Sequence, residues 1–386
     1  MQKQHDTKKD KRRGVVICGA YGLGNAGDEA ILKAILQEVR AFAPGEPITV
    51  LSRAPAETAA LHGIRAIHTF NLPGMLSAMG HAKLYLNGGG SLIQDVTSRR
   101  SLWYYLFTLA AARRLGCRVM MYGCGIGPVR SESGRRLAGK VISRNVDAIT
   151  LRDGDSRDTL AAMGVQGPEI TLAADPAVSL SPAPPEEAEA VLERAGLRPR
   201  EGQHYLGVTV RLWPGFEDKL SAFAQAIDYA YEKYGLLPVF IPIENRQDVA
   251  AAKQVAALLQ KAPAAVLPPC PGSELAIALS ARMDVALSMR LHALIFAAAR
   301  GVPLVGVVYD PKVSAFLDSV DQDLYVQLDQ LTAGTLCTLL DAAADRVRDR
   351  AALEAKTARL VELERTNQVL AARLLRTCTH NRETPS

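Results

Sequence analysis

The sequence alternates short apolar runs with amphipathic helical patterns, and this alternation constrains the fold more than any other feature. The segment DEAILKAILQEVRAF (28–42), for example, places Ile31, Ile35 and Val39 on one helical face. Helical patterns, notably 101–115, separate most of the apolar runs. Runs rich in β-branched residues predict buried strands at 13–19, 48–53, 82–90, 118–128, 147–153 and 169–176. Repetition of strand, helix and strand predicts a parallel sheet covered on both faces.

A proline-rich stretch, SLSPAPPEEAE (179–189), interrupts the alternation and predicts a linker. Beyond it, further strands are expected at 205–211, 236–244, 283–290, 302–310 and 323–328, with helices over 217–234, 246–261, 274–282 and 292–300. We therefore expect an α/β fold with two Rossmann-like parallel-sheet domains facing a cleft, one over 14–180 and one over 190–330. The Leu-, Ala-, Arg- and Glu-rich tail predicts C-terminal helices over 331–378. In such sheets ligands bind beyond the carboxyl ends of the strands.

Composition excludes several classes of protein. Hydrophobic residues make up 48% and charged residues 22%, an ordinary globular composition. Much of the net charge of +5 lies in MQKQHDTKKDKRR (1–13), which predicts a disordered basic leader; the remaining chain is close to neutral, which argues against nucleic acid as a partner. No apolar run approaches the roughly 18 residues that span a bilayer. Six cysteines without CxxC or metal-ligand spacing favour a reducing, cytoplasmic setting and no metal site.

The first strand is followed by the glycine loop GLGNAG (22–27), which matches the G-x-G-x-x-G pattern of dinucleotide-binding loops. Asp28 and Glu29 oppose that function, because they place negative charge where a pyrophosphate needs bare N–H groups. Asp28 is instead expected to be the N-cap of the helix. Three alternatives stay open: a dinucleotide site, with NADP favoured by Arg53; a loop that holds a polar acceptor through Asn25; and a tight turn without a ligand.

Two further glycine loops follow later strands of the first half. The run NGGGSLIQD (87–95) contains three successive glycines followed by Asp95, and YGCGIGPV (122–129) follows the next strand. Glycines let a backbone approach a ligand closely or permit a positive φ in a turn. Three such loops at neighbouring carboxyl ends predict one shared ligand edge, with candidate binding residues Gly88, Gly89, Gly90 and Asp95.

Five basic or titratable side chains also stand at strand ends: Arg152, Arg211, Arg290, His292 and Lys312. Each alone is compatible with a surface cation in a local ion pair. Together they predict a site for an anion, because cations held close to one another repel without one. His292 is a candidate acid or base near pH 7. The chain lacks a G-x-S-x-G elbow, an HExxH motif and a Walker lysine, so hydrolase and NTPase functions lack their parts.

Taken together, these motifs resemble the polysaccharide pyruvyl transferase family, most closely its bacterial branch in secondary cell wall polysaccharide synthesis and S-layer anchoring. The resembling stretches are GAYGLGNAGDEAIL (19–32), NGGGSLIQDVTSRRSLWYY (87–105), YGCGIGPV (122–129), LRDGDS (151–156), AADPA (173–177), SMRLHALIFAA (288–298) and VVYDPKV (307–313). They run from about residue 15 to 325. One departure is Cys124, where relatives commonly carry glutamine.

The resemblance implies a GT-B-like fold and transfer of pyruvate from phosphoenolpyruvate onto a sugar as a 4,6-ketal. The N-terminal domain would be the acceptor side and the C-terminal domain the donor side. The family's donor-site residues fall on Arg152, His292 and Lys312, with Arg290 in the same element as His292. Phosphoenolpyruvate is then a co-substrate, and no cofactor or metal is implied. The acceptor implied for the cell-wall branch is a lipid-linked disaccharide containing N-acetylmannosamine.

The residues fit this chemistry, but other functions stay open. Arginine forks suit planar oxyanions, lysine supplies a compact charge, and His292 can give or take a proton. Asp95, Asp175 and Asp310 are candidates for orienting sugar hydroxyls, or else caps and turn residues. The competing functions are a GT-B glycosyltransferase that uses a nucleotide sugar and a non-catalytic glycan- or nucleotide-binding protein.

A lipid-linked acceptor would bring the protein to the membrane surface. The segment LWYYLFTLAAA (102–112) has four aromatic residues and lies between two arginine pairs. An interfacial helix has this pattern, and so does a core helix with charged ends. We favour the core assignment and expect at most a peripheral contact with the cytoplasmic face of the membrane.

Overall fold

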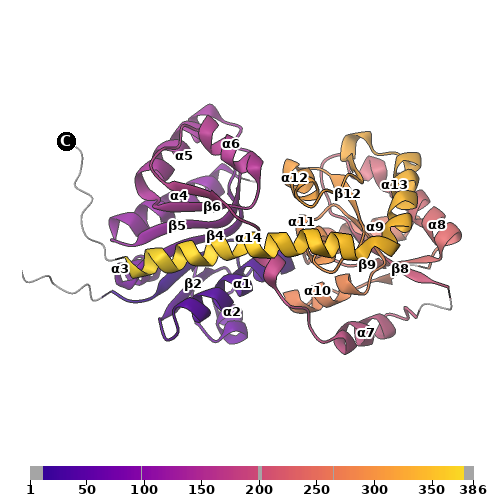
Figure 1. Cartoon of the computed structure of the whole chain (residues 1–386), viewed down its shortest axis with the longest axis horizontal. Helices are drawn as coiled ribbons and strands as arrows, with labels where there is room; N and C mark the ends of the chain where they lie inside the picture. The colour runs from indigo at the N-terminus through magenta and orange to yellow at the C-terminus, as the bar shows by residue number, and fades with distance from the viewer. Residues whose placement is uncertain (1–11, 97, 199–201, 264, 378–386) are drawn as a thin grey trace, which may run out of the picture.

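The computed structural model describes residues 12–96, 98–198, 202–263 and 265–377, and it contains two parallel sheets joined by one linker (Figure 1). Nearly all of the predicted leader lies outside the described residues. The first sheet has seven strands in the order β3-β2-β1-β4-β5-β6-β7, and the second has six in the order β10-β9-β8-β11-β12-β13. The predicted pair of Rossmann-like domains is confirmed.

The N-terminal sheet is built from short strands whose side chains are mostly buried. Its strands are β1 (Val15–Cys18), β2 (Ile48–Ser52), β3 (Arg65–His68), β4 (Leu84–Ile93), β5 (Arg118–Ile126), β6 (Ala148–Leu151) and β7 (Glu169–Leu172). Its helices are α1 (Ala26–Phe42), α2 (Pro55–His62), α3 (Leu72–His81), α4 (Arg99–Arg114), α5 (Glu132–Asn145) and α6 (Gly154–Ala162). The strand β3 was not predicted from the sequence.

The C-terminal sheet repeats the design after the linker, which leads from the short 3-10 helix η1 (Pro176–Ser179) to α7 (Pro185–Arg194). Its strands are β8 (His204–Thr209), β9 (Leu236–Phe240), β10 (Ala265–Val266), β11 (Val285–Ser288), β12 (Leu304–Val308) and β13 (Tyr325–Gln327). Its helices are α8 (Leu220–Tyr234), α9 (Gln247–Ala256), α10 (Ser273–Ala281), α11 (Leu291–Ala298), α12 (Pro311–Ser319) and α13 (Ala333–Asp345). Among these elements, the two-residue strand β10 and the helix α12 were not predicted.

The start of α1 corrects one prediction. Asn25, not Asp28, is the N-cap: its side-chain oxygen accepts a hydrogen bond from the Gly27 amide at 2.9 Å. The helix begins earlier than predicted because the Ala26 amide donates to the Ile243 carbonyl of the other domain at 2.8 Å. Tertiary contact across the domains therefore decides where α1 begins.

The two domains share part of their core. One cluster of buried apolar side chains combines Ile31 and Ile35 of α1 with Ile277 of α10 and Leu291 and Phe296 of α11. Apolar burial of this kind stabilises an interface by roughly 25 cal/mol per Å². The relative position of the domains is thus fixed by packing in addition to the linker.

The last helix, α14 (Arg350–Arg376), runs along both domains, as Figure 1 shows in yellow. Near its start, the Thr357 hydroxyl donates to the Ala298 carbonyl in the C-terminal domain at 3.0 Å. Near its end, the Asn367 amide donates to the Ala174 carbonyl in the N-terminal domain at 3.1 Å. The predicted C-terminal helix is confirmed, and it bridges the two sheets.

The helix α4 covers one face of the N-terminal sheet and contains the segment 102–112. Leu102, Leu106 and Leu109 are fully buried against that sheet, as the core assignment predicted. Trp103 and Phe107 on the same helix are exposed. Across the described residues, none of the helices is both long and apolar enough to cross a bilayer.

Candidate active site

A cavity of about 830 Å³ lies between the domains, where the carboxyl ends of both sheets meet. In the first sheet β1 pairs with both β2 and β4, and in the second β8 pairs with both β9 and β11. These are the points at which the strand order reverses, so the loops on either side diverge and leave a crevice. The cavity is lined by eight of the predicted residues, Asn25, Asp28, Gly90, Arg152, Arg211, Arg290, His292 and Lys312.

Backbone contacts close one side of the cavity. Asn25, in the first glycine loop, forms an antiparallel bridge with Glu244 after β9, and the Asn245 amide donates to the Gly24 carbonyl at 3.2 Å. Inside the same loop, the Gly22 amide donates to a carboxylate oxygen of Glu29 at 2.7 Å. That carboxylate takes the loop amide that a pyrophosphate would need, which disfavours the dinucleotide alternative.

The glycine run 87–95, predicted to be a loop after a strand, lies mostly within the strand β4, which continues to Ile93. Its three successive glycines serve two purposes. A Cβ at Gly88 would come within 2.6 Å of the Tyr21 hydroxyl, and one at Gly89 within 2.1 Å of Ile31. These two positions therefore permit close packing and do not line the cavity. Gly90, with a φ of 68°, does line it. Only the third glycine of the run occupies the predicted ligand edge.

Arg152 follows β6 and is held beneath the cavity by a buried carboxylate. Its guanidinium donates to Asp175 at 2.7 Å and to the Ser91 hydroxyl at 3.1 Å. Burial would lower the pKa of Arg152, but Asp175 and Asp153 more than offset this and raise it. Gly125 lies in the strand β5 and not in the predicted glycine loop. It leaves room for this side chain, since a Cβ there would lie 3.0 Å from Nε.

His292 reaches the same carboxylate from the other domain. Its Nε2 lies 3.7 Å from an oxygen of Asp175, within electrostatic reach but beyond a hydrogen bond. That nitrogen is buried and has no hydrogen-bond partner among the described residues. Burial alone would raise the pKa of Asp175, but His292 and Arg152 together hold it well below its usual range. The carboxylate is therefore ionised between two cationic or protonatable groups.

The imidazole of His292 also packs directly on the first turn of α1. A Cβ at Gly27 would lie 2.1 Å from Nδ1 of His292. Only glycine at this position leaves space for the ring. The last glycine of the first loop thus positions the histidine instead of binding a phosphate.

Arg290, the residue before α11, has its carboxylate partner within its own domain. Its Nε donates to both oxygens of Asp248, at 2.9 and 3.0 Å. Asp248 also accepts from the amides of Ile243 and Glu244, at 3.1 and 2.9 Å. Burial would lower the pKa of Arg290, but Asp248 raises it on balance. The hydrogen bonds to Asp248, which two backbone amides hold in place, therefore fix the orientation of this arginine.

Arg211 and Lys312 share an aromatic neighbour, Tyr309. Arg211 donates to the Tyr309 hydroxyl at 3.0 Å and to the Gln247 side chain at 2.8 Å, and its guanidinium lies 5.0 Å from the ring centres of Trp213 and Tyr309. Its Nε is buried without a partner among the described residues. Lys312 lies 5.5 Å from the Tyr309 ring. Within the described part of the chain, the side chains that accept hydrogen bonds from Arg211 are uncharged. Its positive charge is therefore available to a ligand in the cavity.

Asn25 and Asp28 line the cavity from the N-terminal domain. The Asn25 amide donates to Asp28 at 2.7 Å. Burial raises the pKa of Asp28, although His292, Arg290 and Lys312 oppose the shift. A carboxyl group with a raised pKa beside a ligand cavity is suited to proton exchange.

Three predicted aspartates do not line the cavity. Asp95 accepts from the Arg130 amide at 2.7 Å and from the Ser131 hydroxyl at 3.1 Å. Asp310 is the N-cap of α12 and pairs with Lys312 at 3.2 Å, while Asp175 acts beneath the cavity through Arg152 and His292. Cys124, the departure from the family pattern, is fully buried and its thiol faces the Thr150 carbonyl at 3.5 Å.

Sequence reasoning missed three residues of the site: Ser91, Asp248 and Tyr309. Ser91 directly follows the three glycines, and Tyr309 directly follows a strand, so both stand where the topology places ligands. Asp248 lies in the first turn of α9, which is also an ordinary place for an aspartate at a helix start. Only the structure shows its contact with Arg290.

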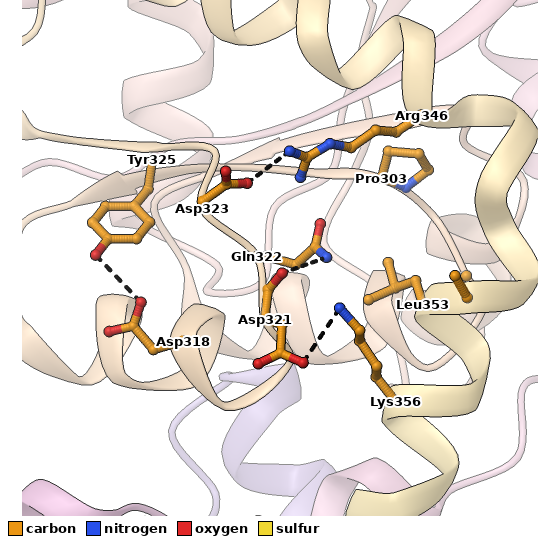
Figure 2. Close-up of a pocket in the computed structure, with 11 residues that line it drawn as sticks. Pro303, Asp318, Asp321, Gln322, Asp323, Tyr325, Arg346, Leu353 and Lys356 are labelled. Carbon is orange, nitrogen blue, oxygen red and sulfur yellow. Dashed lines mark hydrogen bonds and ion pairs between the residues drawn. The ribbon is translucent and has the colours of Figure 1, made fainter.

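A second cavity, of about 670 Å³, lies on the C-terminal domain beside the start of α14 (Figure 2). Its charged side chains pair with one another: Lys356 with Asp321 at 3.3 Å and Arg346 with Asp323 at 2.7 Å. It shares none of its lining residues with the cavity between the domains. The Lys356–Asp321 pair attaches α14 to the C-terminal domain. The interdomain cavity remains the candidate active site.

Solved structures with the same fold include sugar-nucleotide enzymes. Anabaena HepE, crystallised with UDP-glucose, is 11% identical with a TM-score of 0.65, covering 94% of this chain and 99% of its own. A glycosyltransferase from Rickettsia africae is 10% identical with a TM-score of 0.64, covering 95% and 100%. UDP-GlcNAc 2-epimerase from Neisseria meningitidis is 13% identical with a TM-score of 0.59, covering 94% and 99%. At these identities the likeness confirms the GT-B-like fold and nothing about the reaction.

The sequence itself carries the more specific signal. No curated protein matches the chain. The profile of the family described as polysaccharide pyruvyl transferase matches residues 25–311, a stretch that begins in the first glycine loop and ends beside Lys312. This span includes Arg152 and His292, which meet in the cavity from opposite domains. The chain belongs to the polysaccharide pyruvyl transferase family.

Proposed function

We propose that this protein transfers the pyruvyl group of phosphoenolpyruvate to a sugar, forming a 4,6-linked ketal and releasing phosphate. The observation that carries the proposal is the convergence of Arg152, Arg211, Arg290, His292 and Lys312 on one cavity at the carboxyl ends of both sheets. Membership of the family gives the reaction class. The donor and the ketal linkage are what the family resemblance implies, and the chemistry of these side chains fits both.

Phosphoenolpyruvate has a carboxylate and a phosphate, close to three negative charges at neutral pH. A planar carboxylate and a tetrahedral phosphate can both accept paired hydrogen bonds from an arginine fork. Among the described residues, the Arg211 guanidinium donates to two uncharged side chains, Tyr309 and Gln247. Arg290 is held rigidly by Asp248, so little side-chain entropy is lost when it binds an oxyanion. Lys312 supplies a compact positive charge on the same side. A leaving phosphate would be stabilised by these groups.

The reaction needs two proton transfers. Protonation of C3 of the enol makes C2 electrophilic, and one sugar hydroxyl attacks C2 and loses its proton. Expulsion of phosphate and attack by the second hydroxyl close the ketal, and the second proton leaves with the phosphate. His292 is the candidate for one transfer, since its buried Nε2 has no hydrogen-bond partner among the described residues. Asp28, across the cavity with a raised pKa, is the candidate for the other. The scheme calls on no metal or cofactor.

The acceptor would lie against the N-terminal domain, beside Asn25, Asp28 and Gly90. Amide, carboxyl and backbone groups there suit sugar hydroxyls. Following the resemblance to the cell-wall branch, the expected acceptor is a cell-wall polysaccharide precursor, a lipid-linked disaccharide with N-acetylmannosamine. S-layer anchoring would be the purpose of that product.

A nucleotide-sugar glycosyltransferase is the competing function. It is favoured by the fold, because Anabaena HepE was crystallised with UDP-glucose. Those neighbours are 10–13% identical, whereas the family profile spans residues 25–311 of this chain. The donor distinguishes the two functions.

The test is to incubate the protein with phosphoenolpyruvate and a lipid-carrier disaccharide analogue, and in parallel with UDP-sugars. We expect phosphate release that depends on the acceptor. The product should be heavier than the acceptor by the mass of one pyruvic acid less one water. Consumption of a UDP-sugar with no use of phosphoenolpyruvate would refute the proposal. Arg211→Ala, which removes a cation held by uncharged groups, should raise the KM for phosphoenolpyruvate at least tenfold, or about 1.4 kcal/mol.

A further inference from the structure

Charge is distributed very unevenly along the N-terminal domain. Residues 58–131 contain eight Lys or Arg and a single acidic residue, Asp95, in a chain with 45 basic and 40 acidic residues overall. The carboxylate of Asp95 is already engaged by the backbone amides of Arg130 and Ser131. This stretch builds α3 and α4, which belong to the same lobe in Figure 1. Arg113 and Arg118 pair with Asp147, and the other basic residues of the stretch give this part of the domain an excess of positive charge.

The same surface exposes large apolar side chains. Phe70 is 65% exposed, Trp103 57%, and Phe107 and Leu72 45% each. We call these four residues the aromatic face. Trp103 and Phe107 are one turn apart on α4, and the Phe70 ring meets Tyr104 of α4 edge-on with the ring centres 5.9 Å apart. Single exposed apolar residues are ordinary, but a neighbouring group of this size marks an interaction site.

Arginines frame the aromatic face. Arg99 and Arg100 begin α4, Arg114 ends it beside Arg113, which pairs with Asp147 at 3.0 Å, and the helix itself contains no acidic residue. Arg53 lies 4.6 Å from the centre of the Phe70 ring and also lines the interdomain cavity. Aromatic side chains between basic residues are typical of helices that lie at a membrane surface.

We propose that the aromatic face docks onto an anionic lipid bilayer, with Trp103 and Phe107 entering the headgroup region and the arginines contacting lipid phosphates. A second copy of the chain is a poor occupant, because two such faces would bring like charges together. The proposal depends on this surface and not on the reaction. Because Arg53 joins the aromatic face to the cavity, docking would place the mouth of the cavity at the membrane, where a lipid-linked sugar could reach it.

The test measures flotation of the full chain with vesicles of phosphatidylglycerol or of phosphatidylcholine. We expect binding to phosphatidylglycerol vesicles that falls at least tenfold in 0.5 M salt, since the attraction is partly electrostatic. The double variant Trp103→Ser, Phe107→Ser should bind at least tenfold more weakly. The matched control is Leu258→Ser, which removes a 41%-exposed leucine of the C-terminal domain and should bind like the wild type. Circular dichroism checks that each variant is folded.

A spectroscopic readout keeps the proposal open to refutation if the double variant misfolds. The chain has two tryptophans, and vesicles should shift the emission of Trp103 to the blue, a shift that Trp103→Phe should abolish. No binding to phosphatidylglycerol at low salt, an unchanged emission spectrum, or equal binding by Leu258→Ser and the double variant would overturn the proposal. So would tighter binding to a single-stranded oligonucleotide, or a lipid-free dimer that the double variant abolishes.

Discussion

The two buried arginines of the site are held in different ways. Arg290 is bound to Asp248 entirely within the C-terminal domain. Arg152 is bound to Asp175, a carboxylate that also lies 3.7 Å from His292 of the opposite domain. The first arrangement is complete in one domain, whereas the second is complete only when the two domains are in contact.

This difference gives the two arginines separate roles within one cavity. A rigid, preassembled Arg290 suits binding of the donor anion, because its orientation does not depend on the other domain. The Arg152–Asp175–His292 group suits the chemical step, because it forms only when the domains meet. Changes to contacts across the domains should therefore reduce kcat, and changes to contacts within the C-terminal domain should mainly raise KM.

The largest effect is expected for His292→Ala. Loss of the proposed proton-transfer group should lower kcat by about 10²–10⁴-fold, with a much smaller change in KM. Steady-state phosphate release, together with a pH profile, measures this. Wild-type turnover in the folded variant would exclude His292 from the chemistry and remove the main distinction between the two arginines.

The next effect compares Asp175→Asn with Asp248→Asn. Each leaves a buried arginine without its carboxylate, so each should lower the free energy of unfolding by about 3–5 kcal/mol. Only Asp175→Asn should also lower kcat, because only Asp175 contacts both domains. Urea unfolding and kinetics measure the two quantities separately, and an equal loss of kcat in both variants would contradict the comparison.

Asp175 also predicts a pH dependence with a definite sign. His292 and Arg152 lower its pKa in the folded protein, so its contribution to stability is present above the ordinary carboxyl pKa of about 3.9 and is lost as the pH falls below it. Asp175→Asn should remove that part of the acid destabilisation. Between pH 3 and 6, the urea midpoint of Asp175→Asn should change less with pH than that of the wild type.

Gly27→Ala should lower kcat by an intermediate amount, because it would displace the His292 ring without removing it. The added methyl group would lie 2.1 Å from the His292 ring and displace it, and a shift of about 1 Å can cost about 100-fold in rate. The matched control is Gly334→Ala, also at the second residue of a helix, where a Cβ meets nothing within 4 Å. If both variants keep wild-type kcat, the packing of α1 on His292 does not matter for catalysis.

Sequence alone predicted most of the strands, and the two it missed have a common physical cause. The strands β3 and β10 are the outer edges of their sheets, and neither contains a continuous buried apolar run. Central strands such as β4 and β5 are buried on both faces and so read as apolar runs. Burial on both faces makes a parallel strand easy to recognise in a sequence, although the edge strands β7 and β13 were predicted without it.

The part of the site that could be predicted is the part whose position follows from parallel strand topology alone. Arg152, Arg211 and Arg290 each follow a strand, so they reach the carboxyl edge whatever the domains do. Contacts that depend on how the domains meet were not predictable: the approach of His292 to Gly27 and the hydrogen bond from Ala26 to Ile243 at the start of α1 both require the other domain. Nor does the spacing of Asp248 and Arg290 in the chain indicate that they pair.

The smallest expected effect concerns the contact of α14 with α1. Glu364 is 2% exposed and faces Glu38, and burial together with that neighbour raises the pKa of Glu38 to about 10. A carboxyl with a raised folded pKa contributes stability that is full at low pH and is lost as the pH rises above its unfolded value of about 4.3. Glu38→Gln should therefore stabilise the protein by about 1 kcal/mol or more at pH 8 relative to pH 5.

Thermal unfolding at both pH values measures this, with Glu362→Gln on the exposed side of α14 as control. A gain of the same size at both pH values would show that Glu38 and Glu364 are not buried together. It would also contradict the packing of α14 on α1.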